Sequence, residues 1–126
     1  MTAIAPSPRK RRPAAPPAPT LLALVQGVLE DGKADDITLI DLAGKSAMAD
    51  HMLIASGRSQ RQVVALAERL QRALRDAGHG RVPVEGLPHG DWVLIDAGDI
   101  LVHLFRPEVR VYYNLEKMWG VPLGGP

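Results

Sequence analysis

The chain has 126 residues, a formal net charge of +1 and an apolar content of 46%, which together suit one domain with a modest core. No run of 18 uncharged apolar residues occurs and no apolar stretch follows the basic start, so we expect neither a membrane span nor a secretory signal. The absence of cysteine excludes disulfides, thiolate metal sites and cysteine nucleophiles, and it agrees with a cytoplasmic setting.

Residues 1–19 are rich in proline and contain no acidic residue, which predicts a disordered tail. Four of the 15 Lys and Arg residues lie there, as Arg9-Lys-Arg-Arg12, so the remaining chain carries 11 basic against 14 acidic residues, a net charge of −3. A mildly acidic body suits a basic protein partner better than nucleic acid. Two roles for the tail stay open: a weak, nonspecific contact with RNA phosphates, or a solvated leader.

The domain is expected to begin with a helix. Thr20 is placed to cap this helix, and Gly32 marks its end. Its apolar residues lie three and four positions apart: Leu21, Leu24, Val25, Val28 and Leu29. Two short apolar strands follow, over residues 36–41 and 51–55, with a turn that begins at Gly44 between them.

The clearest signal in the sequence is a helix that begins after Ser59. Ser59 and Gln62 match the capping box, in which two polar side chains satisfy free amides at a helix start. Apolar residues follow at helical spacing as far as Ala77, and Gly78 supplies the stop.

The last part of the sequence predicts a hairpin and a helix. Residues 91–96 and 100–105 are apolar runs joined by a short turn that contains Gly98. Pro107 is suited to open a final helix that reaches Trp119, and residues 120–126 form a C-terminal tail. The order is therefore helix, two strands, helix, two or three strands, helix: a single α/β domain over residues 20–120 with helices packed on a mixed sheet. Both sides of the 91–96 strand are apolar, so helices cover both faces of the sheet or one face is left for a partner.

Little in the sequence points to catalysis. The four histidines, His51, His79, His89 and His103, form no paired metal-binding motif. Residues 56–59 followed by a helix are similar to the start of a nucleotidyl-transfer site, but the two-metal mechanism of such sites needs paired carboxylates. Asp96 and Asp99 are three residues apart and flank a turn instead. We expect no enzyme activity, metal or cofactor, and Mg²⁺-dependent nucleotide binding stays the enzymatic alternative.

The aromatic residues lie close together in the sequence. All five fall within the last 35 residues: Trp92, Phe105, Tyr112, Tyr113 and Trp119. Phe105 is expected in the core, whereas Trp92 suits the core and an interface equally, because tryptophan is enriched at binding hot spots. Tyr112 and Tyr113 point about 100° apart on a helix, so they cannot be equally buried and one of them is expected to be exposed.

Three acidic residues accompany these aromatics. Asp96, Asp99 and Glu116 would surround an aromatic surface with negative charge. The alternative is that the two aspartates stabilise a turn and that Glu116 lies on a solvated helix face.

Several motifs together resemble the ribosomal silencing factor family, also called Iojap-like. The most specific are Asp91-Trp-Val-Leu-Ile-Asp96, Val102-His103 and Leu115-Glu-Lys-Met-Trp119. Residues 36–42, 44–46, 50–57, 85–86 and 98–99, with Ser59, Arg110 and Tyr113, agree as well. The resemblance runs from about residue 21 to residue 119 and does not include the basic tail.

The resemblance implies an α/β fold of nucleotidyltransferase-like topology without catalysis. It also implies binding to the L-fourteen protein on the inter-subunit face of the large ribosomal subunit, where the protein would block subunit joining and repress translation under nutrient limitation, as in stationary phase. Members of the family are often homodimers when free. The partner-binding residues that we predict are Trp92, Asp96, His103, Tyr113 and Glu116. With Trp92 as the anchor, Trp92→Ala should weaken binding more than Glu116→Gln. A nucleic-acid adaptor that uses residues 1–19 is the third functional class that stays open.

Overall fold

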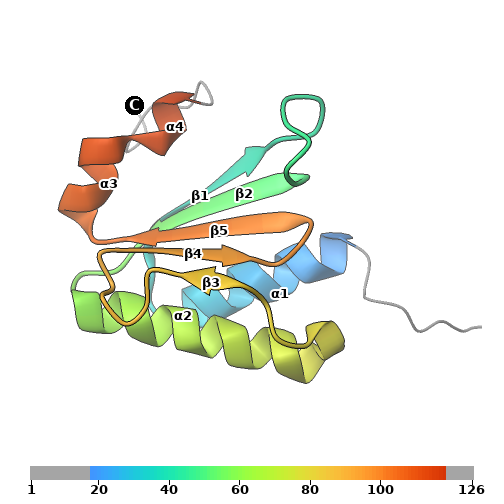
Figure 1. Ribbon diagram of the computed structural model, residues 1–126, viewed down its shortest axis with the longest axis horizontal. Coiled ribbons are helices and arrows are strands. Elements are labelled where there is room, and N and C mark those ends of the chain that lie inside the picture. Colours follow the sequence, from blue (N-terminus) through green and yellow to red (C-terminus); the bar gives the residue numbers. More distant parts are fainter. Residues whose placement is uncertain (1–17, 119–126) are drawn as a thin grey trace, which may run out of the picture.

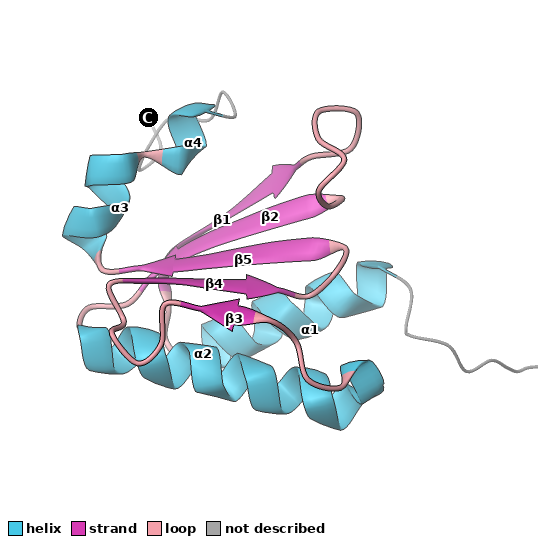
Figure 2. Ribbon diagram, in the orientation of Figure 1, coloured by secondary structure: helices cyan, strands magenta, loops and turns pink. Residues whose placement is uncertain are grey.

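The computed structural model describes residues 18–118, which form a five-stranded sheet with helices on both faces (Figure 1). The strands are β1 (Asp35–Asp41), β2 (His51–Ser56), β3 (Val84–Glu85), β4 (Trp92–Asp96) and β5 (Ile100–Phe105). They lie in the order β1-β2-β5-β4-β3. The central pair β2 and β5 is parallel and the other three pairs are antiparallel, so the sheet is mixed as predicted (Figure 2).

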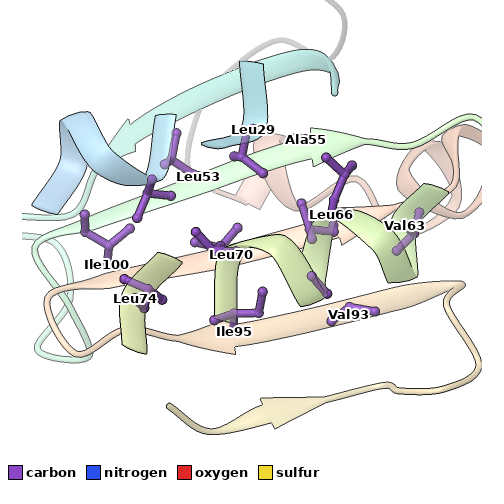
Figure 3. Packing of buried hydrophobic residues seen from close by; sticks show 14 of the residues in the cluster. Leu29, Leu53, Ala55, Val63, Leu66, Leu70, Leu74, Val93, Ile95 and Ile100 are labelled. Atoms are coloured by element: carbon purple, nitrogen blue, oxygen red, sulfur yellow. The ribbon is translucent and has the colours of Figure 1, made fainter. Parts of the chain in front are cut away.

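One face of the sheet is covered by α1 (Ala18–Asp31) and α2 (Gln60–Leu74), which continues into the π-helical turn η1 (Arg75–His79). Leu66, Leu70 and Leu74 of α2 point toward the sheet (Figure 3). They pack against Leu53 and other buried side chains of β2, β4 and β5: Ala55, Val93, Ile95, Ile100, Val102 and Leu104. Each fully buried leucine or isoleucine stabilises the fold by about 2 kcal/mol, so this layer is the main core.

The start of α2 confirms the predicted cap. Ser59 is the N-cap, and its hydroxyl accepts a hydrogen bond from the amide of Gln62 at 3.1 Å. The Gln62 side chain reaches back to the amide of Arg58 at 2.7 Å, one residue before the cap. It also donates to the carbonyls of Gly32 and Lys33, so it ties the start of α2 to the end of α1.

The opposite face has a smaller cover. It is formed by α3 (Pro107–Tyr113) and α4 (Leu115–Met118), which lie over one end of the sheet (Figure 1), and by Leu42 and Ala49 beside the β1–β2 loop. Phe105 is buried there, as expected, with Ile40, Met52, Ile54 and Leu101. Trp92 and Leu94 are only partly buried, so helices meet both faces and part of the second face stays open.

Two predicted helix limits are wrong. The first helix begins at Ala18 rather than after a cap at Thr20, because a proline in the first turn removes only an amide that has no intrahelical acceptor. The predicted helix from Pro107 to Trp119 is two helices, since Asn114 adopts the left-handed conformation (φ 48°, ψ 58°) and ends α3. Trp119, the C-terminal tail and residues 1–17 of the predicted basic tail lie outside the described residues.

Candidate partner-binding surface

An aromatic cluster occupies the open part of the second face. Trp92 of β4 lies opposite Phe105 of β5, and His103 lies opposite Leu94, so these four side chains share one side of the sheet. Tyr113 of α3 reaches the same place. The Trp92 ring centroid is 4.7 Å from that of Tyr113, 4.9 Å from that of Phe105 and 5.9 Å from that of His103. The predicted residues Trp92, His103 and Tyr113 are therefore brought together.

His103 fixes the orientation of Trp92. The indole Nε1–H donates a hydrogen bond to His103 Nδ1 at 2.9 Å. Because an indole nitrogen only donates, Nδ1 must be unprotonated, and the imidazole proton lies on Nε2. Burial of His103, which is 7% exposed, lowers its pKa to about 4 and keeps the ring neutral at physiological pH. His103 thus lies beneath the surface and positions Trp92, rather than presenting its own ring to a partner.

Trp92 separates two shallow grooves. The first, of about 400 Å³, is lined by Asp91, Trp92, Glu108, Val109, Tyr112 and Tyr113. The second, of about 270 Å³, is lined by Glu85, Gly86, Trp92 and Leu94. We call Trp92, Leu94, Tyr112 and Tyr113 the aromatic surface. Tyr112 and Tyr113 are 81% and 50% exposed, so both tyrosines, rather than one, are available to a partner.

The rim of the aromatic surface is acidic, and part of that charge is paired. Hydrogen bonds from Gln60 and from Arg106 lower the pKa of Asp91, so this carboxylate is ionised. Arg106 also pairs with Glu108 at 3.1 Å, so one guanidinium balances one of two carboxylates. Glu85 is exposed on the other side of Trp92. The rim therefore keeps a net negative charge that suits a basic partner.

Asp96 and Glu116 lie outside the aromatic cluster, Asp96 at the far end of β4 and Glu116 in the interior. Asp96 is exposed and shares the face, but it is four residues along β4, about 13 Å away at 3.3 Å per residue. Its carboxylate accepts a hydrogen bond from the amide of Gly98 at 2.9 Å, which is the turn role that we gave as the alternative.

The exposed position that we expected for Glu116 is wrong. Glu116 is 1% exposed, and its Oε2 accepts hydrogen bonds from Arg110 Nη2 at 2.6 Å and Nε at 3.1 Å. Arg110 is buried too and donates to the hydroxyls of Ser56 on β2 and Thr38 on β1. A buried carboxylate needs a charged partner, and this pair joins α3 and α4 to the sheet.

The predicted partner-binding residues do not include four residues that line or support the site: Leu94, Tyr112, Glu85 and Arg110. Glu85 lies opposite Leu94 in the two-residue strand β3, which is too short for a periodic signal. Arg110 and Glu116 are six residues apart, outside the three- and four-residue spacings at which helical side chains meet. Glu85, Leu94 and Arg110 belong to the resemblance described above and Tyr112 to the aromatic residues, but none of these signals showed that the four residues matter at the site.

The described residues thus form a single α/β domain with an aromatic surface suited to protein recognition. Within residues 18–118, no group of three or more His, Asp or Glu residues could hold a metal ion, and no described helix is long and apolar enough to cross a membrane. Residues 15–122 match the family model described as ribosomal silencing factor during starvation. The chain belongs to this family, as the motifs predicted.

Individual relatives agree with this assignment. Ribosomal silencing factor RsfS of Zymomonas mobilis is 55% identical over 114 residues, which span 90% of this chain and 85% of that protein. A mouse protein named mitochondrial assembly of ribosomal large subunit protein 1 is 30% identical over 99 residues, 76% of this chain and 43% of that protein. The crystal structure of protein CV0518 from Chromobacterium violaceum has a TM-score of 0.81 and 39% identity, and covers 85% of this chain and 89% of its own. The nucleotidyltransferase-like topology stays a prediction.

Proposed function

We propose that this protein binds the L-fourteen protein on the inter-subunit face of the large ribosomal subunit and sterically blocks subunit joining. In this way it would repress translation in the cytoplasm when nutrients are limiting. Membership of the ribosomal silencing factor family supports a regulatory role on the ribosome, and the name of the mouse relative supports the large subunit as the place of action. We propose binding rather than catalysis as the role of the domain over residues 20–120.

The observation that carries this proposal is the placement of Trp92. Its ring is partly exposed between two grooves, held from below by His103 and from one side by Tyr113, and surrounded by an acidic rim. A rigid aromatic anchor within such a rim fits a basic ribosomal protein. Truncating a central tryptophan typically costs roughly 2–4 kcal/mol of binding free energy, whereas an exposed carboxylate contributes less than about 1 kcal/mol.

The exposed side of α3, which includes Tyr112 of the aromatic surface, offers a place for a second copy when the protein is free. Val111 and Tyr112 on α3 are 60% and 81% exposed, which is high for large apolar side chains. We propose that a homodimer would cover part of this apolar area and that ribosome binding would compete with it. The oligomeric state of Tyr112→Glu tests this, since a charge at the contact should shift the protein toward the monomer.

Co-sedimentation with isolated ribosomal subunits tests the proposed function. The wild-type protein should migrate with the large subunit alone and reduce the yield of joined ribosomes. Trp92→Ala should bind at least about 30-fold more weakly, while Asp96→Asn, on the same face but distant from Trp92, should bind within about fivefold of wild type. Thermal unfolding of both variants verifies that they are folded.

Two outcomes would contradict this proposal in different ways. A folded Trp92→Ala variant that binds like the wild type would remove the aromatic surface from the interface. Wild-type protein that stays at the top of the gradient, with subunit joining unaffected, would overturn the function itself. Nucleotide binding that requires Mg²⁺ would then support the enzymatic alternative.

A further inference from the structure

The arginines of the described chain fall into two groups. Arg58, Arg106 and Arg110 each form an ion pair with an acidic side chain. Five others are exposed and have no carboxylate oxygen within 4.0 Å among residues 18–118: Arg61, Arg69, Arg72, Arg75 and Arg81. All five belong to α2, η1 or the loop after them. They therefore lie on the side of the sheet that α1 and α2 cover, whereas Trp92 lies on the other side. These guanidinium groups keep their hydrogen-bond donors available.

Three of these arginines line one groove. Arg72, Arg75 and Arg81 border a hollow of about 600 Å³ at the end of α2, together with Gln71 and a single acidic residue, Glu68. Gly78 and Gly80 have φ values of 95° and 70°, which glycine adopts without strain, and they let the chain turn so that Arg81 joins the other two. The lining residues therefore carry a net charge of +2. We call this hollow the arginine groove.

The excess positive charge does not extend into the neighbouring groove. That groove is lined by Arg69 and Arg72 but also by Asp31 and Asp76, so its charges cancel. The excess of positive charge is thus local to Arg72, Arg75 and Arg81. The net charge of −3 outside the first 20 residues does not reveal it, because acidic residues elsewhere in the fold outweigh it.

The N-terminal basic segment is joined to the fold at the same end of the molecule. The first residues of α1 lie at the end of the helical layer where α2 passes into η1 (Figure 1). The sequence Arg9-Lys-Arg-Arg12 is connected to the first described residue, Ala18, by a short stretch of chain. The basic sequence Arg9-Lys-Arg-Arg12 is therefore connected to the end of the domain that carries the arginine groove.

We propose that the arginine groove binds the phosphodiester backbone of folded RNA. The choice of RNA rests on the proposed function, because a protein on the large ribosomal subunit is surrounded by RNA. Arginine side chains donate paired hydrogen bonds to phosphate oxygens. The groove is lined by no aromatic side chain on which a base would stack. It therefore contacts the backbone without sequence preference and helps to orient the protein whose opposite face carries Trp92.

Binding of a dye-labelled RNA hairpin to the full chain, measured by fluorescence anisotropy over a range of salt concentrations, tests the groove. We compare Arg75→Gln/Arg81→Gln with the charge-matched control Arg58→Gln/Arg61→Gln. The groove variant should weaken binding and lower the slope of log affinity against log salt by about two, one for each lost phosphate contact. The control should keep a slope close to that of the wild type.

Three results would overturn the assignment. Equal losses in the two variants would indicate diffuse charge attraction, and no loss in the groove variant would leave RNA binding to residues 1–17. Vesicles that contain phosphatidylserine are the third probe: if they bind and the groove variant loses that binding as it loses the hairpin, the groove is not selective for RNA. Vesicles that do not bind would support RNA.

The failure of this proposal can be told from that of the proposed function. A wild-type protein that binds the hairpin but does not co-sediment with the large subunit would contradict the proposed function alone. A protein that co-sediments, but whose hairpin binding does not change in Arg75→Gln/Arg81→Gln, would contradict the arginine groove alone. Trp92→Ala should bind the hairpin like the wild type, because Trp92 lies on the other face of the sheet.

Discussion

The buried imidazole of His103, which accepts the hydrogen bond from Trp92, couples the stability of the domain to pH. Burial lowers the pKa of His103 from 6.5 to about 4 in the folded protein, whereas the unfolded chain keeps the ordinary value. Between these values the unfolded state binds more protons. The contribution of this neutral, buried imidazole is therefore complete above pH 6.5 and is lost as pH falls toward 4, by roughly 3 kcal/mol in total.

Urea unfolding of the wild type and of His103→Asn between pH 7.5 and pH 4.5 checks this prediction. The asparagine oxygen can accept the indole hydrogen bond but does not titrate. The variant should therefore lose the part of the pH dependence that lies between pH 6.5 and 4.5, while other groups still contribute. If the free energy of unfolding of both proteins falls equally over this range, His103 is not the group responsible.

The sequence predicts the positions of single side chains better on the strands than on the final helices. Trp92 and His103 lie on β4 and β5, whose alternation places both on one face, and the structure agrees. Glu116 was expected at the surface because a glutamate at a helical position is usually solvated. Its burial depends on Arg110, and sequence spacing gives no sign of that contact because Asn114 interrupts the helix between them.

The ion pair of Arg110 and Glu116 holds the α3–α4 unit against the sheet. We predict that Glu116→Gln destabilises the domain by about 3 kcal/mol, because it leaves the Arg110 guanidinium buried without a counter-charge. Chemical denaturation gives this value directly. The double variant Arg110→Leu/Glu116→Leu should recover at least half of the loss, since replacing both partners removes both buried charges. If the loss of unfolding free energy in the double variant equals the sum of the losses in Arg110→Leu and in Glu116→Leu, the two side chains are not coupled.

The sequence predicts the N-cap of α2 most completely, and the contribution of this cap to the free energy of unfolding can be measured separately. Ser59→Ala should cost about 1 kcal/mol, since it removes the acceptor for the Gln62 amide. Ser46→Ala is the matched control, because it also removes a hydroxyl that accepts an amide hydrogen bond, from Met48 at 3.1 Å, but in the β1–β2 loop rather than at a helix start. It should change stability by less than about 0.5 kcal/mol. Thermal unfolding distinguishes the two, and equal melting temperatures for the variants would show that the cap contributes nothing of its own.

The elements differ in how far local sequence specifies them. The start of α2 follows from residues 59–62 alone, because its cap is local. The predicted stop, Gly78, has a non-helical φ of 95° but lies in η1, beyond the end of α2 at Leu74. The break between α3 and α4 requires a left-handed Asn114, which the Arg110–Glu116 pair stabilises from outside the turn. The strand β3 exists only because β4 offers it an edge. Such elements cannot be predicted without the tertiary contacts that select them.

For the whole molecule, the sequence predicts the α/β class but not the arrangement of the sheet. Both sides of β4 are apolar, which left open whether helices or a partner cover each face. The structure gives a different answer for each face: α1 and α2 cover most of one, and α3 and α4 cover only part of the other. The parallel pairing of β2 with β5 joins residues about 50 positions apart, and a local pattern carries no information about it.

The positions of the aromatic surface and the arginine groove predict how their contributions to binding the large subunit combine. The aromatic surface and the arginine groove lie on opposite sides of the sheet and share no residue. If each contacts a different component of the ribosome, the loss of binding free energy in Trp92→Ala and in Arg75→Gln/Arg81→Gln should add within about 0.5 kcal/mol in the triple variant. Affinity for purified large subunits, measured at two salt concentrations, checks this. The groove contribution should shrink at high salt while the Trp92 contribution stays nearly constant, because salt screens phosphate contacts but not the burial of an indole ring. A groove effect that vanishes once Trp92 is removed would instead mean that the arginines act only through the aromatic interface.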